Sequence, residues 1–374
     1  MSNMTREQFL ERITAGCLAS LLPFRSEARD VPAPAVGGPL LIPYPAKPWA
    51  QSTRLVGDRP QQSLAALEGK SPSFDRLPLY NDFCLASDAA GRWHCIGILF
   101  EGSNAEDFRQ DKLFHRVAES VQGPYRSIEY VDLGYGKQSG VWAPYIWRDK
   151  HRALIFYAYF GGDGASMSIR GAQASDPQLR SWRRGVAGKE VLFSESADRD
   201  PQIIRDRRTG LYSLYYVTSI GTNAEAQNVV RLRTSHDLLS WSEPRTVLGT
   251  PPGYKAAESV FVLQENGYYY MWVSGFDYAL MSLYISTDPT NFGDAADNRM
   301  EEQSGHAPEI VHADGRYWMA CVAIASVPGL PNGKDLPIAQ HDLEGVYLQP
   351  KEWRAATPEM LAKVVGARDQ RPHH

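Results

Sequence analysis

Five related segments recur along this chain of 374 residues, and they limit its fold more than any other feature. In each, a turn precedes a strand rich in aromatic and aliphatic residues: Gly91-Arg92-Trp93, His151-Arg152-Ala153, Gly210-Leu211-Tyr212, Gly267-Tyr268-Tyr269 and Gly315-Arg316-Tyr317. Repeats of about 40–50 residues built from short strands are typical of β-propellers, in which each repeat forms one blade. We therefore predict an all-β protein folded as a five-bladed β-propeller.

A second signature supports four strands in each repeat. It places a Ser or Thr shortly before an Asp and an aromatic residue after it: Ala174-Ser175-Asp176 with Trp182, Thr234-Ser235-His236-Asp237 with Trp241, and Ser286-Thr287-Asp288 with Phe292. An Asp in such a turn accepts hydrogen bonds from the backbone that follows it. Closing five such units into a ring removes the long sheet edges that an open array would expose.

The repeats predict a propeller domain at residues 75–352, flanked by simpler segments. Residues 1–74 are expected to form an N-terminal helix or degenerate export signal and a Pro-rich extended arm at 32–60, with regular structure beginning near residue 75. Residues 353–374 are expected to form a short helix, Pro358 to Val365, and a frayed end.

The N-terminal segment leaves the location of the protein open. Residues 5–22 resemble a twin-arginine export signal in which Glu7 replaces the second arginine, but they also fit an amphipathic helix. The protein is then either cytoplasmic or exported to the periplasm. The longest uncharged segment, Ile13 to Phe24, is much shorter than the ~20 apolar residues that span a bilayer, so we expect no membrane association.

Charge and cysteine content narrow the possible partners. Lys and Arg number 39 against 43 Asp and Glu, without a basic run, so nucleic acid is not an expected partner. The cysteines Cys17, Cys84, Cys95 and Cys321 lack the spacing of a zinc site, and we expect no structural metal. Cys84 and Cys95 either face each other across a hairpin as a disulfide or are two small buried residues.

One position of the repeat carries the candidate chemistry. Counting back nine residues from each turn, or ten in the third segment, gives Asp82, Trp142, Asp200, Glu258 and His306, at intervals of 60, 58, 58 and 48 residues. The innermost strands of a propeller run alongside its central channel, so these side chains are expected to converge at one end of that channel.

Three carboxylates in one partly dehydrated funnel would raise at least one pKa by mutual repulsion and desolvation. A protonated acid beside an ionised carboxylate is the minimum equipment for cleaving a glycosidic bond. Each residue alone also has a structural interpretation: an Asp at a strand start forms turns, Trp142 belongs to a core, and His306 is a hydrogen-bonded polar residue. The coincidence of three acids at one repeat position favours the functional interpretation.

These residues resemble the five-bladed propeller glycoside hydrolases, family 43 with its relatives and families 32 and 68, over residues 75 to 350. Five short matches carry the resemblance: Tyr80-Asn81-Asp82, Trp142-Ala143-Pro144, Arg199-Asp200-Pro201, Ala257-Glu258-Ser259 and Gly305-His306-Ala307. Phe83 and Cys84 replace the Pro-Asn that usually follows in invertases, and Ser259 stands where a Cys or Gly is expected.

The resemblance implies catalytic roles for three acids. Asp82 would be the nucleophile or general base, Glu258 the general acid, and Asp200 the carboxylate that holds sugar hydroxyls and tunes the acid. Asn81, Trp142, Arg199, Phe276 and His306 would bind the carbohydrate substrate, although Arg199 fits a solvated position nearly as well. No cofactor would be required, and a calcium ion in the channel is compatible with the resemblance.

The sequence leaves the reaction and the substrate open. We expect hydrolysis of a furanoside-type or small oligosaccharide bond, and the alternatives are a transglycosylase, a phosphorylase or a non-catalytic carbohydrate-binding propeller. Asn-Asp and Arg-Asp-Pro favour a retaining enzyme, whereas Trp-Ala-Pro and the histidine favour an inverting one. The loops at 101–114, 135–141, 219–228 and 327–334 are long and polar, and they are expected to rim the pocket or to be surface decoration.

Overall fold

The chain divides into two compact units, Met1–Ala33 and Pro34–His374. A computed structural model describes residues 39–46, 53–56, 79–100, 112–136, 139–161, 167–195, 197–222, 225–251, 253, 257–275, 280–322 and 346–366, all in the second unit. The predicted N-terminal helix or export signal, Cys17, Phe276, loop 327–334 and most of loop 101–114 lie outside these residues.

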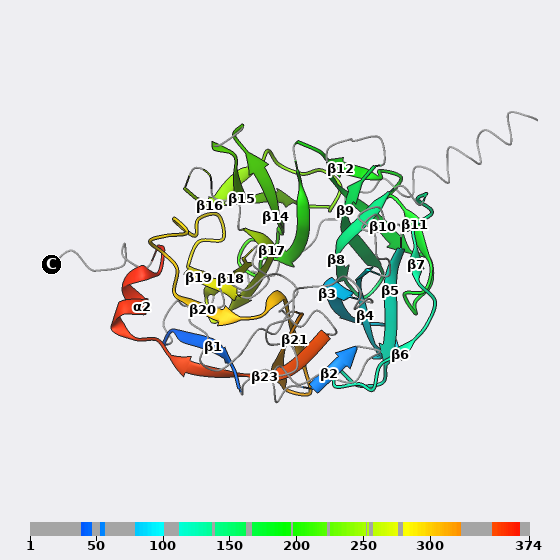
Figure 1. Cartoon of the computed structure of the whole chain (residues 1–374), viewed down its shortest axis with the longest axis horizontal. Coiled ribbons are helices and arrows are strands. Elements are labelled where there is room, and N and C mark those ends of the chain that lie inside the picture. The colour runs from blue at the N-terminus through cyan, green and yellow to red at the C-terminus, as the bar shows by residue number, and fades with distance from the viewer. Residues whose placement is uncertain are drawn as a thin grey trace, which may run out of the picture. The chain divides into compact units, whose positions relative to one another are not determined.

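The second unit is a ring of five antiparallel sheets, each one blade of a β-propeller (Figure 1). Blade 1 contains β3 (Leu79–Ser87), β4 (Trp93–Phe100), β5 (Lys112–Ala118), β6 (Arg126–Ser127) and β7 (Val131–Asp132). Blade 2 contains β8 (Gly140–Arg148), β9 (Ala153–Phe160), β10 (Ser168–Ala174), β11 (Trp182–Arg184) and β12 (Val191–Phe193). Blade 3 contains β13 (Arg199–Arg205), β14 (Tyr212–Ile220), β15 (Gln227–Ser235) and β16 (Arg245–Leu248). Blade 4 contains β17 (Glu258–Glu265), β18 (Tyr268–Ser274), β19 (Leu280–Ser286) and β20 (Glu301–Ser304).

Blade 5 joins the two ends of the propeller. It contains β21 (His306–Ala313), β22 (Arg316–Val322) and β23 (Val346–Ala355), and β23 also pairs with β1 (Leu41–Pro45) and β2 (Thr53–Val56). The expectation that regular structure begins near residue 75 is therefore wrong. β1 carries two prolines, which suit an edge strand because a proline has no N–H to donate to a sheet.

The two turn signatures are confirmed. The five tripeptides lie where the first strand of each blade turns into the second, so β3, β8, β13, β17 and β21 are the innermost strands. Each of these contacts the innermost strand of the next blade, and β21 contacts β3 to complete the ring. In the second signature, the Oδ1 atoms of Asp176, Asp237 and Asp288 accept backbone N–H groups two residues on.

Helix α2, Pro358–Lys363, is the one helix within the described residues and confirms the expected short C-terminal helix. It ends two residues early because Val364 has an extended backbone, and Val365 then forms a bridge with Ser286 of β19. No helix in the described part of the chain is long and apolar enough to cross a membrane.

Cys84, Cys95 and Cys321 are free thiols buried in the sheets. Cys84 pairs in register with Ile96, and Cys95 pairs with Leu85, so the two cysteines lie diagonally rather than opposite each other. They are two small buried residues, which resolves the alternative between a disulfide and a core position.

Blade 1 also buries a histidine pair. His94 of β4 and His115 of β5 are joined by a 2.7 Å contact between Nδ1 and Nε2, and both side chains are almost completely inaccessible. Burial lowers the pKa of His115 from 6.5 to about 3, and the nearby His94 contributes to this shift. The unfolded chain therefore binds this proton first, so stability is lost as the pH falls from about 6.5 toward 3.

The variant His115→Gln is expected to resist acid better than the wild type because glutamine does not titrate. Each pH unit below 6.5 costs about 1.4 kcal/mol of unfolding free energy for such a group, so the wild type should lose about 2 kcal/mol more than the variant between pH 7.5 and 5. Urea unfolding at the two pH values measures the difference. His151→Gln, at an exposed turn, is the control, and equal losses in His115→Gln and wild type would contradict the prediction.

Candidate active site

The innermost strands share a β-bulge at one level of the channel. Pairing with the second strand shifts register between Asn81 and Phe83, Trp142 and Tyr145, Arg199 and Gln202, Glu258 and Phe261, and His306 and Glu309. In four of these bulges a residue other than glycine has a left-handed backbone: Ala143 (φ 46°), Asp200 (φ 56°), Ser259 (φ 46°) and Ala307 (φ 49°). Bulges re-aim side chains, and backbone strain of this kind is concentrated at functional sites.

The bulges correct the predicted alignment by one residue. Trp142, Glu258 and His306 share the last paired position before the bulge, which Asn81 occupies in β3 and Arg199 in β13. Asp82 and Asp200 each follow one residue later, inside the bulge, and Asp200 has the left-handed backbone. The reason is that the turns differ in length: six residues separate β13 from β14, whereas two separate β17 from β18. Counting from the turn therefore misplaces the first and third segments by one residue, although Asp82, Asp200 and Glu258 still meet near the channel.

Asp82 occupies the bulge of β3, where it has no partner in β4. The neighbouring strand comes very close because residue 97 is a glycine. A Cβ on Gly97 would lie 2.8 Å from the backbone oxygen of Asp82 and 2.6 Å from the Cβ of Phe83. A side chain at residue 97 would therefore displace the backbone that carries Asp82.

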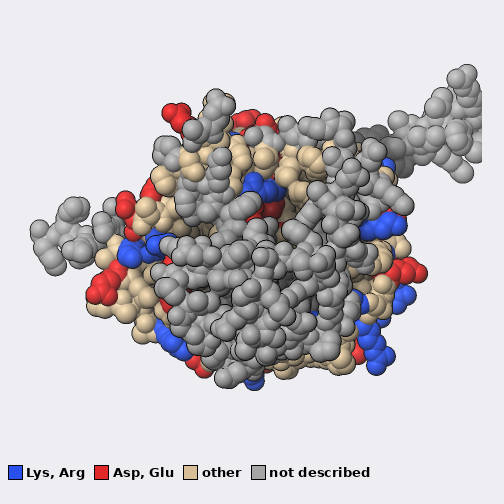
Figure 2. Space-filling view, in the orientation of Figure 1, with Lys and Arg blue, Asp and Glu red and all other residues tan. Residues whose placement is uncertain are grey.

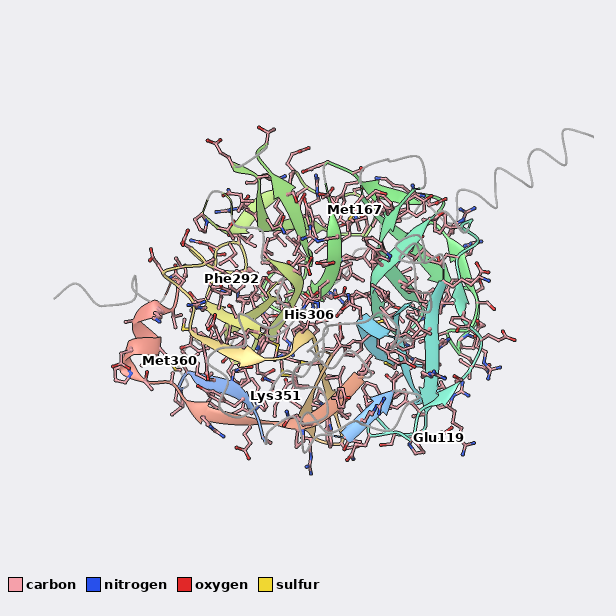
Figure 3. All side chains as sticks on the ribbon, in the orientation of Figure 1. Glu119, Met167, Phe292, His306, Lys351 and Met360 are labelled. Atoms are coloured by element: carbon pink, nitrogen blue, oxygen red, sulfur yellow. The ribbon has the colours of Figure 1, made fainter. Side chains whose placement is uncertain are left out.

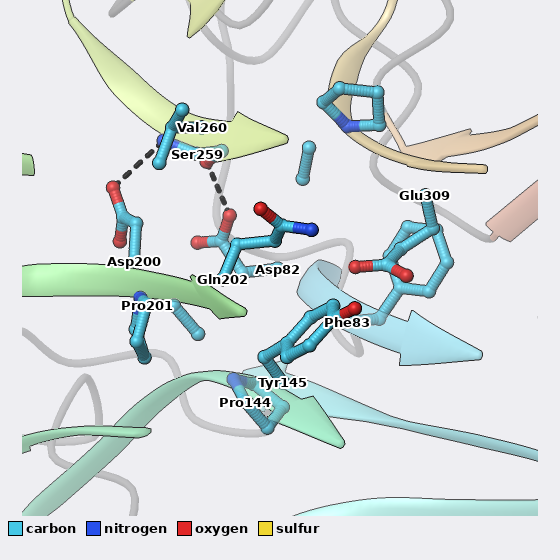
Figure 4. A pocket seen from close by; sticks show the side chains of 13 residues that line it. Asp82, Phe83, Pro144, Tyr145, Asp200, Pro201, Gln202, Ser259, Val260 and Glu309 are labelled. Carbon is cyan, nitrogen blue, oxygen red and sulfur yellow. Dashed lines mark hydrogen bonds between the residues drawn. The ribbon is translucent and has the colours of Figure 1, made fainter. Parts of the chain in front are cut away.

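Ser259 connects the two aspartates (Figure 4). Its hydroxyl donates to Oδ1 of Asp82 at 2.5 Å, and its backbone N–H donates to Oδ2 of Asp200 at 2.8 Å. His306, which is fully buried near the centre of the ring in Figure 3, places Nε2 3.4 Å from the same hydroxyl and 3.9 Å from Oδ1 of Asp82. Four blades thus contribute to one polar cluster.

Arg199 turns inward and supplies the positive charge of this cluster. Its guanidinium lies 3.7 Å from Oδ2 of Asp200 and 3.6 Å from Oε1 of Glu258, and it donates to the backbone oxygen of Ala257. Basic and acidic atoms lie side by side in a hollow of the face seen in Figure 2, near β14 and β17 of Figure 1. The solvated alternative for Arg199 is therefore wrong, and the arginine is a member of the site.

Burial raises the pKa of all three acids. The pKa of Glu258 rises to about 8, with the negative charge of Asp200 adding to desolvation and Arg199 opposing it. The pKa of Asp200 rises to about 6 for the same two reasons, with Asp82 as its negative neighbour. Desolvation also raises the pKa of Asp82, while the hydrogen bond from Ser259 and the charge of Arg199 lower it. The pKa of Glu258 is higher than that of Asp200, so Glu258 holds its proton at neutral pH.

The remaining predicted residues differ in their placement. Trp142 is partly buried and stacks on Phe160, with ring centres 6.0 Å apart. Asn81 is buried next to Asp82 in β3. Phe276 lies outside the described residues.

The sequence analysis did not predict a small cavity at the bulges, or the polar residues that follow the bulges on the innermost strands. A cavity of about 30 Å³, enough for a water molecule, is lined from all five innermost strands by Asp82 and Phe83, Ala143–Tyr145, Asp200–Gln202, Ser259 and Val260, and Ala307–Glu309. Figure 4 shows Tyr145, Gln202 and Glu309 around it. Burial raises the pKa of Glu309 well above its ordinary value. A polar residue within an otherwise apolar inner strand was the signal available in the sequence.

The described residues include no group of three or more His, Cys, Asp or Glu side chains arranged to hold a metal ion. The calcium ion that the resemblance allows therefore has no ligand set of this kind among the described residues.

Known proteins share this architecture. A GH43_1 enzyme from Xanthomonas citri aligns with a TM-score of 0.54 at 14% identity, over 79% of this chain and 96% of that one. The fold is that of family 43 glycoside hydrolases. A β-xylosidase/α-arabinofuranosidase from a compost metagenome aligns at 0.52 and 13% identity, over 75% of this chain and 93% of its own. An endo-arabinase from Bacteroides thetaiotaomicron aligns at 0.51 and 13%, over 75% and 95%.

No protein-family model and no curated protein matches the sequence. The similarity to the solved structures, at 13% to 14% identity, is therefore one of fold, and it confirms the predicted all-β, five-bladed propeller.

The variant Asp200→Asn is expected to lower the pKa of Glu258, because it removes a negative charge that raises it. The pKa of Glu258 is expected to fall by roughly one unit. Carbon-13 NMR titration of carboxyl-labelled glutamate measures it, with the Glu258 signal assigned by its loss in Glu258→Gln. Asp314→Asn, in the exposed turn between β21 and β22, should leave the titration unchanged. A Glu258 titration that is the same in Asp200→Asn and wild type would show that the two groups are not coupled.

Proposed function

We propose that this protein is a glycoside hydrolase whose reaction takes place at Asp82, Asp200 and Glu258. The observation that carries the proposal is the meeting of three largely buried acids from three blades, two of them beside Arg199 and the third linked to Asp200 through Ser259, with the pKa of Glu258 raised to about 8. Glycosidic cleavage needs one carboxylic acid to protonate the leaving oxygen and one carboxylate on the other side of the sugar.

Glu258 is the proposed general acid. A carboxyl with a pKa near the working pH is best suited to give a proton in the transition state and regain it afterwards. Glu258 keeps its proton at neutral pH because its side chain is only 14% exposed and the negative charge of Asp200 raises its pKa, while the charge of Arg199 opposes this. Its proton would pass to the oxygen of the departing alcohol.

Asp82 is the proposed nucleophile or general base. Desolvation raises its pKa, and the hydrogen bond from the Ser259 hydroxyl and the charge of Arg199 oppose this and favour its ionised form. An ionised carboxylate either attacks the anomeric carbon or removes a proton from the attacking water. The distance between the two reacting carboxyl groups, about 5 Å against 6.5–9.5 Å, separates retention from inversion in this chemistry, and NMR of the first-formed anomer decides between them.

Asp200 and Arg199 are proposed to complete the site. Asp200 is held by the Ser259 amide and by Arg199, so its position is fixed while its negative charge maintains the proton on Glu258. Its other oxygen is suited to accept a hydrogen bond from a sugar hydroxyl. Trp142 is proposed to form an apolar wall beside the sugar ring.

The carbohydrate class is proposed from both the residues and the fold. Proteins with this fold include enzymes titled as xylosidase, arabinofuranosidase and arabinase, and one of them is described in complex with xylotriose. We propose a furanoside-type or small oligosaccharide substrate for this chain. Among the described residues, Arg199 and His306 are the basic side chains in contact with the acids, which is too few for the phosphate of a phosphorylase.

Acyl transfer is the other reaction that a Ser, a His and an Asp in contact would suggest. In a serine hydrolase the two ring nitrogens of the histidine serve different partners, one the serine and one the aspartate. Here Nε2 of His306 faces both Ser259 and Asp82, and the serine hydroxyl donates directly to the aspartate. The geometry therefore favours glycosidic over acyl chemistry.

Asp82→Asn and Glu258→Gln are each expected to reduce kcat/KM at least about 100-fold, because each removes an acid–base or nucleophilic group without changing side-chain size. The assay is a panel of chromogenic arabinofuranosides, xylosides, galactosides and fructosides at pH 7. Thermal unfolding confirms that the variants fold, and Asp314→Asn serves as the matched remote control. Full activity in both variants would refute the site assignment, and a carbohydrate-binding protein would show affinity without turnover in the wild type.

A further inference from the structure

Ser259 lies in the bulge layer between two of the acids and takes no part in bond making or breaking in the proposed reaction. It occupies the left-handed position of β17, which Ala143 holds in β8 and Ala307 holds in β21. Serine and alanine have similar shapes and the same backbone restriction at a positive φ. The hydroxyl is thus the one feature that distinguishes residue 259 from those two equivalents.

The contacts of Ser259 reach three other blades. The hydroxyl meets Asp82 of β3 at 2.5 Å and His306 of β21 at 3.4 Å, and the amide meets Asp200 of β13 at 2.8 Å. The hydroxyl has one proton, and an ionised carboxylate can only accept. When Asp82 is ionised, the serine proton therefore points to Asp82, and His306 is left to donate its Nε2 proton to the serine oxygen.

We propose that Ser259 is a positioning residue that keeps Asp82 ionised and fixed in direction, and that links it through one side chain to His306 and Asp200. Its consequence for the reaction rests on the proposed function, whereas the hydrogen bonds themselves do not. In this arrangement His306 Nε2–H donates to Ser259 Oγ, and Ser259 Oγ–H donates to Asp82 Oδ1. Both hydrogen bonds thus point toward the carboxylate.

The electrostatics of Asp82 agree with this role. Its burial raises the pKa, and the hydrogen bond from Ser259 is the largest of the effects that lower it. A hydrogen bond to an ionised group is stronger than one between neutral groups, so its loss shifts the ionisation measurably. Without the hydroxyl, Asp82 would hold its proton at a higher pH and would fail as a nucleophile or base in acid.

Three variants of Ser259 test the inference. Ser259→Ala and Ser259→Gly both remove the hydroxyl, and glycine also removes the backbone restriction. Ser259→Thr keeps the hydroxyl, although its β-branched side chain is poorly suited to a φ of 46°. We expect the Asp82 pKa to rise by about one unit in the alanine and glycine variants alike, and to stay near the wild-type value in the threonine variant. The threonine variant should be the one with a lowered melting temperature.

The readouts are carbon-13 NMR titration of the Asp82 carboxyl, assigned with Asp82→Asn, and the acid limb of the pH profile of kcat/KM. In Ser259→Ala, the Asp82 pKa and the midpoint of the acid limb should both rise by about one pH unit. At a pH well below that midpoint, this shift lowers kcat/KM about tenfold. An Asp82 titration unchanged in both the alanine and glycine variants overturns the inference, even if the wild type hydrolyses glycosides. A shifted titration in a protein with no glycosidase activity overturns the proposed function and leaves the inference standing.

Discussion

Three acids and one arginine meet near the centre of this propeller, and this excess of negative charge determines which acids are protonated. Arg199 can neutralise at most one of the charges of Asp82, Asp200 and Glu258. Two or more unpaired negative charges in a poorly hydrated site carry a large free-energy cost, so at least one of the acids is expected to be protonated. Glu258, with a pKa of about 8, takes the proton, while Asp82 is helped to stay ionised by Ser259.

The propeller fold is what makes this arrangement possible. Each acid comes from a different blade, and each lies at or beside a bulge in an innermost strand. Gln202 binds the backbone of Val262 through both ends of its amide, which locks blade 3 to blade 4 just below the acids. Side chains on strands held in this way lose little freedom when they act, because the scaffold has already ordered them.

Much of the fold follows from local patterns in the sequence. The five turns and the Asp turns depend on residues close together in the chain, so periodicity reveals them, and the three acids were found because they recur with the repeat. The strands β1 and β2 were missed because β1 is interrupted by two prolines and β2 has only four residues, and both pair with β23 far along the chain.

The fine geometry of the site was harder to predict. The positions of Asp82 and Asp200 were offset by one residue because turn length varies between blades, and no sequence pattern reports a bulge. The role of Ser259 depends on contacts to residues 177 and 59 positions away, which only the folded ring brings together. The inward direction of Arg199 likewise follows from its carboxylate neighbours, not from its own strand.

The most direct test of the account is the leaving-group dependence of Glu258→Gln, measured on whichever sugar the wild type cleaves. A general acid matters for a poor leaving group, such as an alkyl alcohol, and hardly at all for 2,4-dinitrophenolate, which departs without a proton. The account predicts that the variant loses at least about 100-fold in kcat/KM with the alkyl glycoside, and less than about tenfold with the dinitrophenyl glycoside. An equal loss with both substrates would contradict the assignment of Glu258 as the acid, and with it the division of protons among the three carboxyls.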